Sequence, residues 1–337
     1  MSCKIAIVGA TGNVGRVAIN ILAQKSFPVE NVIALASKKS FEKKISYGKK
    51  EIISCGVLDG YDFSNVDVAI FATGSSVAEQ YVEKVTSQGC IVIDNSSLFR
   101  MNEDVPLIVP EVNSHDIQNY KKKYIISNPN CSTIQMVMVL NPLHQISKIK
   151  RVVVSTYQST SGAGKAAMDE LYNQTKGIFM NKNIAPKQFT KQIAFNCIPH
   201  IDVFLNNGST KEEWKMQVET QKILDKEIQI SATCVRVPVF VSHSESLNIE
   251  FTSKISEQEA IKALEEAPGI LVLDRRKDKG YATPIDCVND DYIYVSRIRK
   301  DNTVPYGLSM WVVGDNLRKG AALNAVQILE ILIRNYL

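Results

Sequence analysis

The chain has 337 residues, a formal net charge of +4 and seven cysteines. This length favours two domains whose cores are large enough to fold without disulfides. The small net charge gives no indication of nucleic-acid binding, and no apolar run approaches the ~20 residues that a membrane-spanning helix requires. The odd cysteine count, and an apolar run that starts at Ile5, lead us to expect a cytoplasmic protein with free thiols and no secretory segment.

The first third of the chain alternates short apolar runs with amphipathic stretches. The apolar runs predict strands at residues 4–9, 31–36, 67–72, 90–94, 107–109 and 124–126. Helical periodicity predicts helices at residues 14–24 and 77–87. Because strands that alternate with helices form parallel sheets, the sequence predicts an α/β domain with a Rossmann-type doubly wound sheet.

The remainder of the chain has a different pattern, typical of an α+β domain with a mixed or antiparallel sheet. Helices are predicted at residues 132–140, 166–174 and 211–224, and strands at 152–157, 233–241, 247–251, 292–299 and 308–313. A final helix at 316–337 has one apolar face, which we expect to pack on the first domain. The predicted domains are therefore 1–127 with 316–337, for the dinucleotide, and 128–315, for catalysis and dimerisation.

A glycine-rich loop lies between the first predicted strand and the first predicted helix. Its spacing is G-x-x-G-x-x-G, which allows a tight turn and a close backbone approach to a pyrophosphate at the helix N-terminus. The strand–loop–helix context favours a dinucleotide site over a purely structural turn. The candidate contacts are Gly9, Thr11, Gly12, Asn13, Val14, Gly15 and, after the third predicted strand, Thr73.

The turn after the second predicted strand bears on the choice between NAD and NADP. NAD sites usually carry an acidic residue here, but this turn reads Ser37, Lys38, Lys39, Ser40. Hydroxyl and ammonium groups suit a 2′-phosphate, so the sequence favours NADP(H) bound by Ser37, Lys38 and Ser40. The alternative interpretation is a solvated polar turn.

Cys131 is the candidate nucleophile. It follows Pro129 and stands where the predicted helix begins, and a helix N-terminus stabilises a thiolate and lowers the pKa of the thiol. Its polar neighbours indicate an accessible site. By contrast, Cys3, Cys55, Cys90 and Cys234 lie in apolar surroundings and are interpreted as small core residues.

A histidine is the expected acid or base beside such a thiol. His243 follows the predicted strand at 233–241, and residues at strand ends are well placed for catalysis. His200, in a loop after Pro199, remains an alternative on these grounds.

Taken together, these segments resemble the aspartate-semialdehyde dehydrogenase family over essentially the whole chain. The similar segments occur in the family's order, at residues 9–15, 96–100, 128–135, 158–164, 212–215, 236–245 and 314–322. The resemblance implies NADP-dependent reductive dephosphorylation of L-aspartyl 4-phosphate to L-aspartate 4-semialdehyde through a cysteine thioester. This reaction serves the biosynthesis of lysine and diaminopimelate, methionine and threonine. The resemblance further implies small-molecule substrates, no metal, no nucleic-acid or membrane partner, and a homodimer, with a tetramer as the alternative.

The resemblance also implies residue roles. Cys131 would be the nucleophile, His243 the acid/base, and Gln158 would orient the thiol or the thioester. The remaining roles are Arg236 and Glu212 for the amino-acid end of the substrate, Arg100, Lys215 and Asn130 for phosphate, Asn316 for the nicotinamide amide, and Ser161 and Gly162 beside the cofactor. From spacing alone, Glu212 and Lys215 would be interpreted as a solvated surface pair.

Two departures from the family pattern stand out. Lys39 occupies a position where the family usually has arginine, which weakens the expected NADP preference. Ala166-Ala167 stands where family members often carry another small glycine.

The rival functions are an N-acetyl-glutamyl-phosphate reductase, a glyceraldehyde-phosphate dehydrogenase relative and a non-catalytic nucleotide-sensing protein. The first would leave Glu212 without a substrate ammonium, the second would normally carry an acid after the second strand, and the third would not need Cys131.

Overall fold

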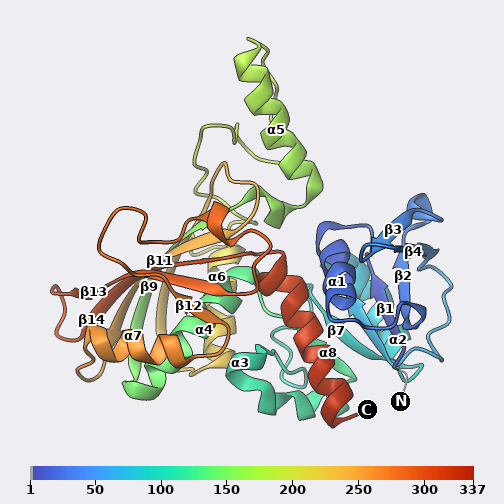
Figure 1. Cartoon of the computed structure of the whole chain (residues 1–337), viewed down its shortest axis with the longest axis horizontal. Coiled ribbons are helices and arrows are strands. Elements are labelled where there is room, and N and C mark those ends of the chain that lie inside the picture. Colours follow the sequence, from blue (N-terminus) through green and yellow to red (C-terminus); the bar gives the residue numbers. More distant parts are fainter. Residues whose placement is uncertain (1–2) are drawn as a thin grey trace. The chain divides into compact units, whose positions relative to one another are not determined.

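The computed structural model describes residues 3–337 and divides the chain into two compact units (Figure 1). The first unit contains the residues up to Asn130 together with Ala321–Leu337. The second contains Cys131–Gly320.

The first unit is built on a six-stranded, all-parallel sheet with the order β5-β2-β1-β6-β7-β8. Its strands are β1 (Ile5–Val8), β2 (Val32–Ala36), β5 (Gly56–Val57), β6 (Val68–Phe71), β7 (Ile91–Asp94) and β8 (Ile125–Ser127). The predicted Rossmann-type sheet is confirmed. Because the strand order reverses between β1 and β6, the loops after these two strands diverge and open the crevice where such sheets bind ligands.

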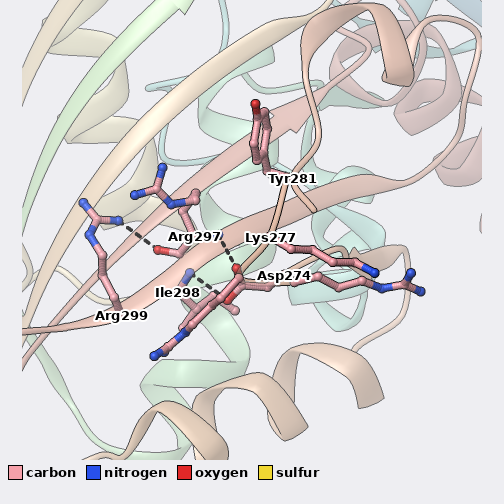
Figure 2. A pocket seen from close by; sticks show the side chains of 8 residues that line it. Asp274, Lys277, Tyr281, Arg297, Ile298 and Arg299 are labelled. Carbon is pink, nitrogen blue, oxygen red and sulfur yellow. Dashed lines mark hydrogen bonds between the residues drawn. The ribbon is translucent and has the colours of Figure 1, made fainter. Parts of the chain in front are cut away.

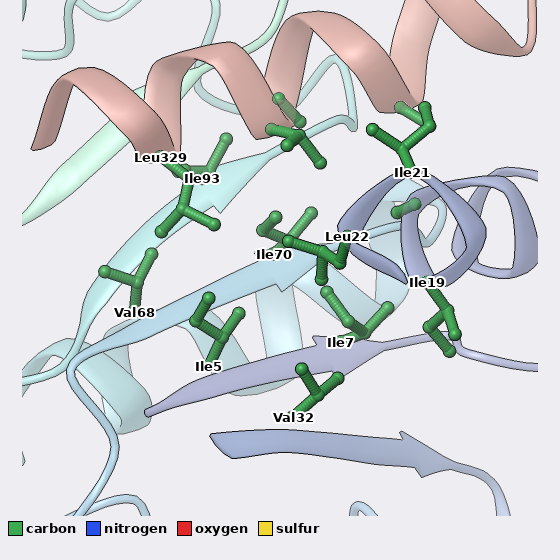
Figure 3. Close-up of a cluster of buried hydrophobic side chains, with 14 of the residues drawn as sticks. Ile5, Ile7, Ile19, Ile21, Leu22, Val32, Val68, Ile70, Ile93 and Leu329 are labelled. Atoms are coloured by element: carbon green, nitrogen blue, oxygen red, sulfur yellow. The ribbon is translucent and has the colours of Figure 1, made fainter. Parts of the chain in front are cut away.

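Helices cover both faces of this sheet. The helices α1 (Asn13–Gln24) and α8 (Leu323–Asn335) pack on the face that carries Ile5 and Ile7, as Figure 3 shows. The helix α2 (Ser75–Thr86) covers the opposite face, which carries Ala6 and Val8. Burial on both faces explains the continuous apolar runs in the sequence.

The rest of the first unit is short or irregular. It includes the hairpin β3 (Lys44–Tyr47) and β4 (Glu51–Ser54), the helix α3 (Pro110–Asn113) and the 3-10 segments Val29–Asn31, Lys38–Ser40 and Ser114–Lys122. The predicted strand at 107–109 is wrong. Leu107 makes only an isolated bridge to Ser127, and Pro110 starts α3 immediately afterwards, because proline suits the first position of a helix.

The second unit is built on a mixed six-stranded sheet, which confirms the predicted sheet type. Its order is β10-β9-β11-β14-β13-β12, with parallel pairs β10/β9 and β12/β13 and antiparallel pairs elsewhere. The strands are β9 (Ile149–Gln158), β10 (Gln229–Arg236), β11 (His243–Phe251), β12 (Ile270–Val272), β13 (Ile293–Asp301) and β14 (Gly307–Gly314).

Three helices contact this sheet, namely α4 (Cys131–Ile146), α6 (Lys211–Ile223) and α7 (Glu257–Glu266). Capping boxes at Thr210 and Ser256 satisfy the first backbone N–H groups of α6 and α7 and fix where these helices begin. The helix α5 (Lys165–Phe179) extends away from the sheet, and a 3-10 turn, Thr160–Ala163, precedes it (Figure 1).

Two predicted boundaries in this part of the chain are wrong for identifiable reasons. The strand predicted at 233–241 ends at Arg236, because Pro238 has no N–H to continue the ladder. The helix predicted from residue 316 begins only at Leu323, after a π-helical turn at Arg318–Ala322. A β-carbon at Gly320, inside this turn, would lie 3.0 Å from Cβ of Cys131.

The glycine loop gives a direct test of the first unit's packing. A β-carbon at Gly15, in the first turn of α1, would overlap the carbonyl oxygen of Gly9, whereas nothing lies within 4 Å of one at Gly74, the residue before α2. We therefore expect Gly15→Ser to lower the free energy of unfolding by about 2 kcal/mol and Gly74→Ser to leave it within about 0.5 kcal/mol. Urea denaturation of both variants measures this, and equal losses would contradict it.

Candidate active site

The first unit presents a site for a dinucleotide at the end of β1. Gly9 has φ +82°, and a β-carbon there would lie 2.7 Å from Cγ2 of Thr73. Gly12 is the N-cap of α1 and no side chain caps this helix, so no side-chain oxygen competes with an anion at the helix N-terminus. The hydroxyl of Thr73 is buried and has no hydrogen-bond partner among residues 3–337, which is the kind of donor that a bound ligand would satisfy.

The turn after β2 approaches the same loop. Thr11 Oγ1 and Ser40 Oγ are 3.4 Å apart, and Ser37 starts the 3-10 turn Lys38–Ser40. Lys38 is largely exposed and lies 3.5 Å from Asp59. Asp59 is an acid near this turn that the sequence analysis missed, because it follows β5, which was not predicted.

Cys131 is the first residue of α4 and is partly exposed. The next residue is held in place, since Gln158 Nε2 donates to Ser132 Oγ over 2.8 Å and to Glu212 Oε1 over 3.1 Å. Cys3, Cys55, Cys90 and Cys234, in contrast, are buried as predicted. Burial raises the pKa of the Cys3 thiol to about 11 and that of Cys90 to about 12, which keeps both unreactive.

His243 is fully buried at the start of β11. It therefore lies at a strand end, although the strand predicted before it at 233–241 already ends at Arg236. The backbone N–H of Ser159 donates to its Nδ1 over 3.1 Å. Because an N–H can only donate, Nδ1 is the acceptor and the neutral ring carries its proton on Nε2. Nε2 has no hydrogen-bond partner in the described chain, and Gly162 leaves space in front of it, since a β-carbon there would lie 3.2 Å away.

The ionisation of His243 follows from its surroundings. Burial, with the neighbouring charge of Arg236, lowers the pKa of His243 to about 3. The side chain is therefore neutral at physiological pH and presents an Nε2–H donor to the space beside Gly162 and Arg236.

Asn316 connects the loops around His243. Its Oδ1 accepts from Ser159 Oγ (3.1 Å), Ser161 Oγ (3.1 Å) and the backbone N–H of Ser242 (2.9 Å). Ser242, just before the histidine, has φ 77°, a conformation that needs such support. The sequence analysis missed Ser159, because its role depends on a partner 84 positions away.

A charged cluster lies beside these groups. Arg236 is buried and donates through Nη1 to the carbonyl oxygen of Ser159 over 2.6 Å. Burial lowers the pKa of Arg236, while the charges of Glu212 and Cys131 raise it. The effect of Cys131 means that its sulfur lies within electrostatic reach of the Arg236 guanidinium.

Lys215 lies between two carboxylates, 2.6 Å from Glu212 Oε2 and 2.9 Å from Asp202 Oδ2. Burial alone would lower the pKa of Lys215, but these carboxylates outweigh it and the net change is upward. No sequence pattern indicates Asp202, which lies in the irregular segment before α6.

Three other candidates have the following places in the structure. Arg100 and Asn130 belong to the first unit, where both are buried and Arg100 Nη2 donates to the carbonyl oxygen of Asn95 over 2.9 Å. His200, the alternative base, stacks on Phe204 with ring centroids 4.4 Å apart.

A separate hollow of about 430 Å³ lies in the second unit, lined by Asp274, Arg275, Arg276, Lys277, Tyr281, Arg297, Ile298 and Arg299. Figure 2 shows that Arg297 and Arg299 extend to one side and Lys277 to the other, so the cations do not converge on one point. Asp274 accepts the backbone N–H groups of Arg297 and Ile298 over 2.8 and 3.0 Å. This hollow holds none of the predicted site residues.

Two kinds of feature are absent from the described residues. Within residues 3–337, no helix combines the length and apolar character needed to cross a membrane. The same part of the chain contains no group of three or more His, Cys, Asp or Glu side chains arranged to hold a metal ion.

Comparisons with known proteins agree with the two-unit architecture. Residues 4–120 match the family described as "Semialdehyde dehydrogenase, NAD binding domain", and residues 140–319 match "Semialdehyde dehydrogenase, dimerisation domain". An aspartate-semialdehyde dehydrogenase of Rickettsia bellii is 49% identical and covers 99% of this chain and 98% of its own. This chain belongs to the aspartate-semialdehyde dehydrogenase family.

Solved structures of the family agree with the fold. Aspartate semialdehyde dehydrogenase II of Vibrio cholerae, complexed with ASA, is 41% identical with a TM-score of 0.97 over 100% of both chains. A Candida albicans aspartate semialdehyde dehydrogenase with NADP is 26% identical, with a TM-score of 0.75 over 98% of this chain and 99% of that one.

The buried histidine predicts a specific pH dependence of stability. Folding lowers the pKa of His243 from about 6.5 in the unfolded chain to about 3. The contribution of the neutral ring to the unfolding free energy is therefore complete above about pH 6.5 and is lost as the pH falls toward 3. Between pH 7 and 5 we expect the wild type to lose about 2 kcal/mol more unfolding free energy than His243→Asn. The exposed His115→Asn should behave like the wild type, and parallel losses in all three proteins would contradict the burial of neutral His243.

Proposed function

We propose that this protein is an NADP-dependent aspartate-semialdehyde dehydrogenase that reductively dephosphorylates L-aspartyl 4-phosphate through a thioester on Cys131. The observation that carries the proposal is the position of Cys131 at the start of α4, within electrostatic reach of Arg236. The same unit holds His243, a buried neutral histidine whose Nε2–H has no partner in the described chain. The relatives named above support the substrate class, since the V. cholerae enzyme was solved in complex with ASA.

NADP(H) is the proposed cofactor, held by the loop from Gly9 to Gly15, the side chains of Thr11, Asn13 and Thr73, and the turn at Ser37, Lys38 and Ser40. The Thr73 hydroxyl, which has no partner in the described chain, and the N-terminus of α1, which no side chain caps, support this binding mode. When bound, the nicotinamide supplies the hydride that reduces the acyl carbon. The C. albicans relative was solved with NADP, and the absence of an acid at positions 37–40 favours NADP over NAD.

The first chemical step belongs to Cys131. Its thiolate attacks the acyl carbonyl, the sulfur–carbon bond forms, and the carbon–oxygen bond to phosphate breaks. The start of α4 and the guanidinium of Arg236 stabilise the anionic sulfur before attack. Arg100, Lys215 and Asn130 are the proposed contacts of the departing phosphate.

The second step needs a donor at the acyl oxygen, which becomes an alkoxide when the thioester is reduced. His243 Nε2–H is proposed for this role, because it is free and pre-oriented by Ser159. The Nε2–H hydrogen bond stabilises this negative oxygen while the ring stays neutral. The oxygen then re-forms the carbonyl double bond as the carbon–sulfur bond to Cys131 breaks, which releases the aldehyde and regenerates the thiolate.

The proposed substrate contacts distinguish aspartate from acylated analogues. Arg236 pairs with the substrate carboxylate and Glu212 with its free ammonium, while Gln158 fixes Glu212 through a 3.1 Å hydrogen bond. An N-acetylated substrate has no ammonium for Glu212. Asn316, Ser161 and Gly162 are proposed to border the nicotinamide.

We further propose a homodimer formed through the second unit, which matches a family described as a dimerisation domain. Tyr157 is exposed on β9 and its ring lies 5.4 Å from that of Trp311 on β14, across the intervening strand β11. These two rings support an apolar contact surface on the unit. The product aldehyde would supply the biosynthesis of lysine and diaminopimelate, methionine and threonine.

The reverse reaction tests the proposal with one assay. We expect NADPH to form from NADP, phosphate and aspartate semialdehyde, and at least about 100-fold slower from N-acetyl-glutamate semialdehyde, because Glu212 then lacks its partner. Cys131→Ala should abolish turnover while NADPH binding stays intact, and the exposed Cys197→Ala is the matched control with normal turnover. Normal turnover in Cys131→Ala would overturn the mechanism.

Lys215 provides a test of the phosphate subsite. We expect Lys215→Ala to raise the KM for phosphate by at least about 10-fold and the KM for NADP by less than about twofold, because one charged contact is lost. Lys211→Ala, one turn earlier on α6, should change neither value. An unchanged phosphate KM in Lys215→Ala would remove this residue from the site.

A further inference from the structure

Glu245 is a buried acid that the proposed chemistry does not use. It lies two residues after His243 on β11, so the two side chains share one face of the strand. The side chain is completely buried, and neither carboxyl oxygen makes a hydrogen bond of normal geometry to any residue from 3 to 337. An ionised carboxylate in such a place costs several kcal/mol, roughly, unless it gains a partner or takes up a proton.

Two other buried polar groups with unused hydrogen-bonding capacity belong to the same region. Thr156 stands directly opposite Glu245 on β9, and its Oγ1 has no partner in the described part of the chain. Gln135 Nε2 also lacks one. Gln135 lies four residues after Cys131, on the same side of α4 and one turn below the sulfur.

Gln135 is the group that connects Glu245 to the nucleophile's helix. Burial raises the pKa of Glu245 well above its ordinary value, and the side chain of Gln135 only partly offsets this. The Gln135 amide also lies against Gly314, the β14 residue opposite His243, where a β-carbon would be 3.4 Å from Oε1. The amide therefore stands between the start of α4 and the strand that carries the histidine.

We infer that Glu245 is a positioning residue: as a neutral carboxylic acid paired with the Gln135 amide, it fixes the first turn of α4 against the strand that carries His243. In this pair the acid O–H would donate to the amide oxygen and an amide N–H would donate to the acid carbonyl, which would satisfy the atoms that have no partner in the described chain. This inference deepens the proposed function and rests on it.

A neutral acid suits this place better than a charged one. The titratable neighbours of Glu245 are His243 on the same strand and Cys234 on β10. Burial raises the pKa of Cys234, and nearby acids that include Glu245 raise it further. The other packed elements contribute uncharged groups, namely Gln135 on α4, Thr156 on β9 and Val312 on β14. A carboxylate here would oppose formation of the Cys131 thiolate, whereas a neutral acid supports the geometry without adding charge.

The test compares four variants in the aspartate semialdehyde assay: Glu245→Gln, Glu245→Met, Gln135→Met and the double methionine variant. Glu245→Met should lower kcat by at least about 10-fold with an unchanged KM for NADP, because the acid–amide link is lost. Its melting temperature should also fall, because the buried Gln135 amide loses its partner, so the loss of kcat is the result that marks a positioning role. The conservative Glu245→Gln should restore kcat to within about threefold of the wild type, with the same pH profile.

The pairing itself is measured by the double variant. If Glu245 and Gln135 act as one unit, the double methionine variant should be no more than about twofold slower than either single one. Multiplicative losses would overturn the pairing.

Three other outcomes would overturn the inference. Full kcat in Glu245→Met would show that the acid does not position the site. A fall in melting temperature without a fall in kcat would show a purely structural role. Loss of kcat or a shifted pH profile in Glu245→Gln would show that the charge matters. If the wild type itself does not oxidise aspartate semialdehyde, the proposed function fails instead, so the two failures are distinguishable.

Discussion

The site depends on the hydrogen bond from the backbone N–H of Ser159 to Nδ1 of His243. A backbone donor cannot change its role, so this bond sets the tautomer of the ring and leaves the proton on Nε2. The fully buried position makes the neutral ring the stable form at physiological pH. A histidine that was free to rotate or to ionise would present neither a fixed donor nor a fixed direction.

The surrounding groups can be understood as support for that one bond. Arg236 donates to the carbonyl oxygen of Ser159, while Asn316 accepts from its hydroxyl and from the backbone of Ser242. These contacts fix the end of β9 and the loop that enters β11, two segments that the sequence places far apart. The charged groups also serve one another, because Lys215 and Arg236 lie near Glu212 and offset the cost of burying its carboxylate.

Features that depend on local pattern could be predicted from the sequence. The glycine loop, five of the six strands of the first sheet and the helix that starts at Cys131 follow from periodicity, glycine spacing and composition. The missed features depend on partners distant in sequence. Ser159, Asp202 and Glu245 look like ordinary polar residues until the fold brings them to His243, Lys215 and Gln135. The same holds for the π-helical turn at Arg318–Ala322, whose glycine lies against Cys131. The roles of Glu212 and Lys215 were available only from the resemblance to the family, because their spacing alone is that of a surface pair.

The central claim is that the sulfur of Cys131 carries the acyl group between the two half-reactions. Peptide mass spectrometry after incubation with aspartate semialdehyde and NADP, without phosphate, tests this most directly. The account predicts one equivalent of NADPH and an aspartyl thioester on the peptide that contains Cys131, which added phosphate removes. NADPH formation with no acyl adduct, or with the adduct on another residue, would contradict it.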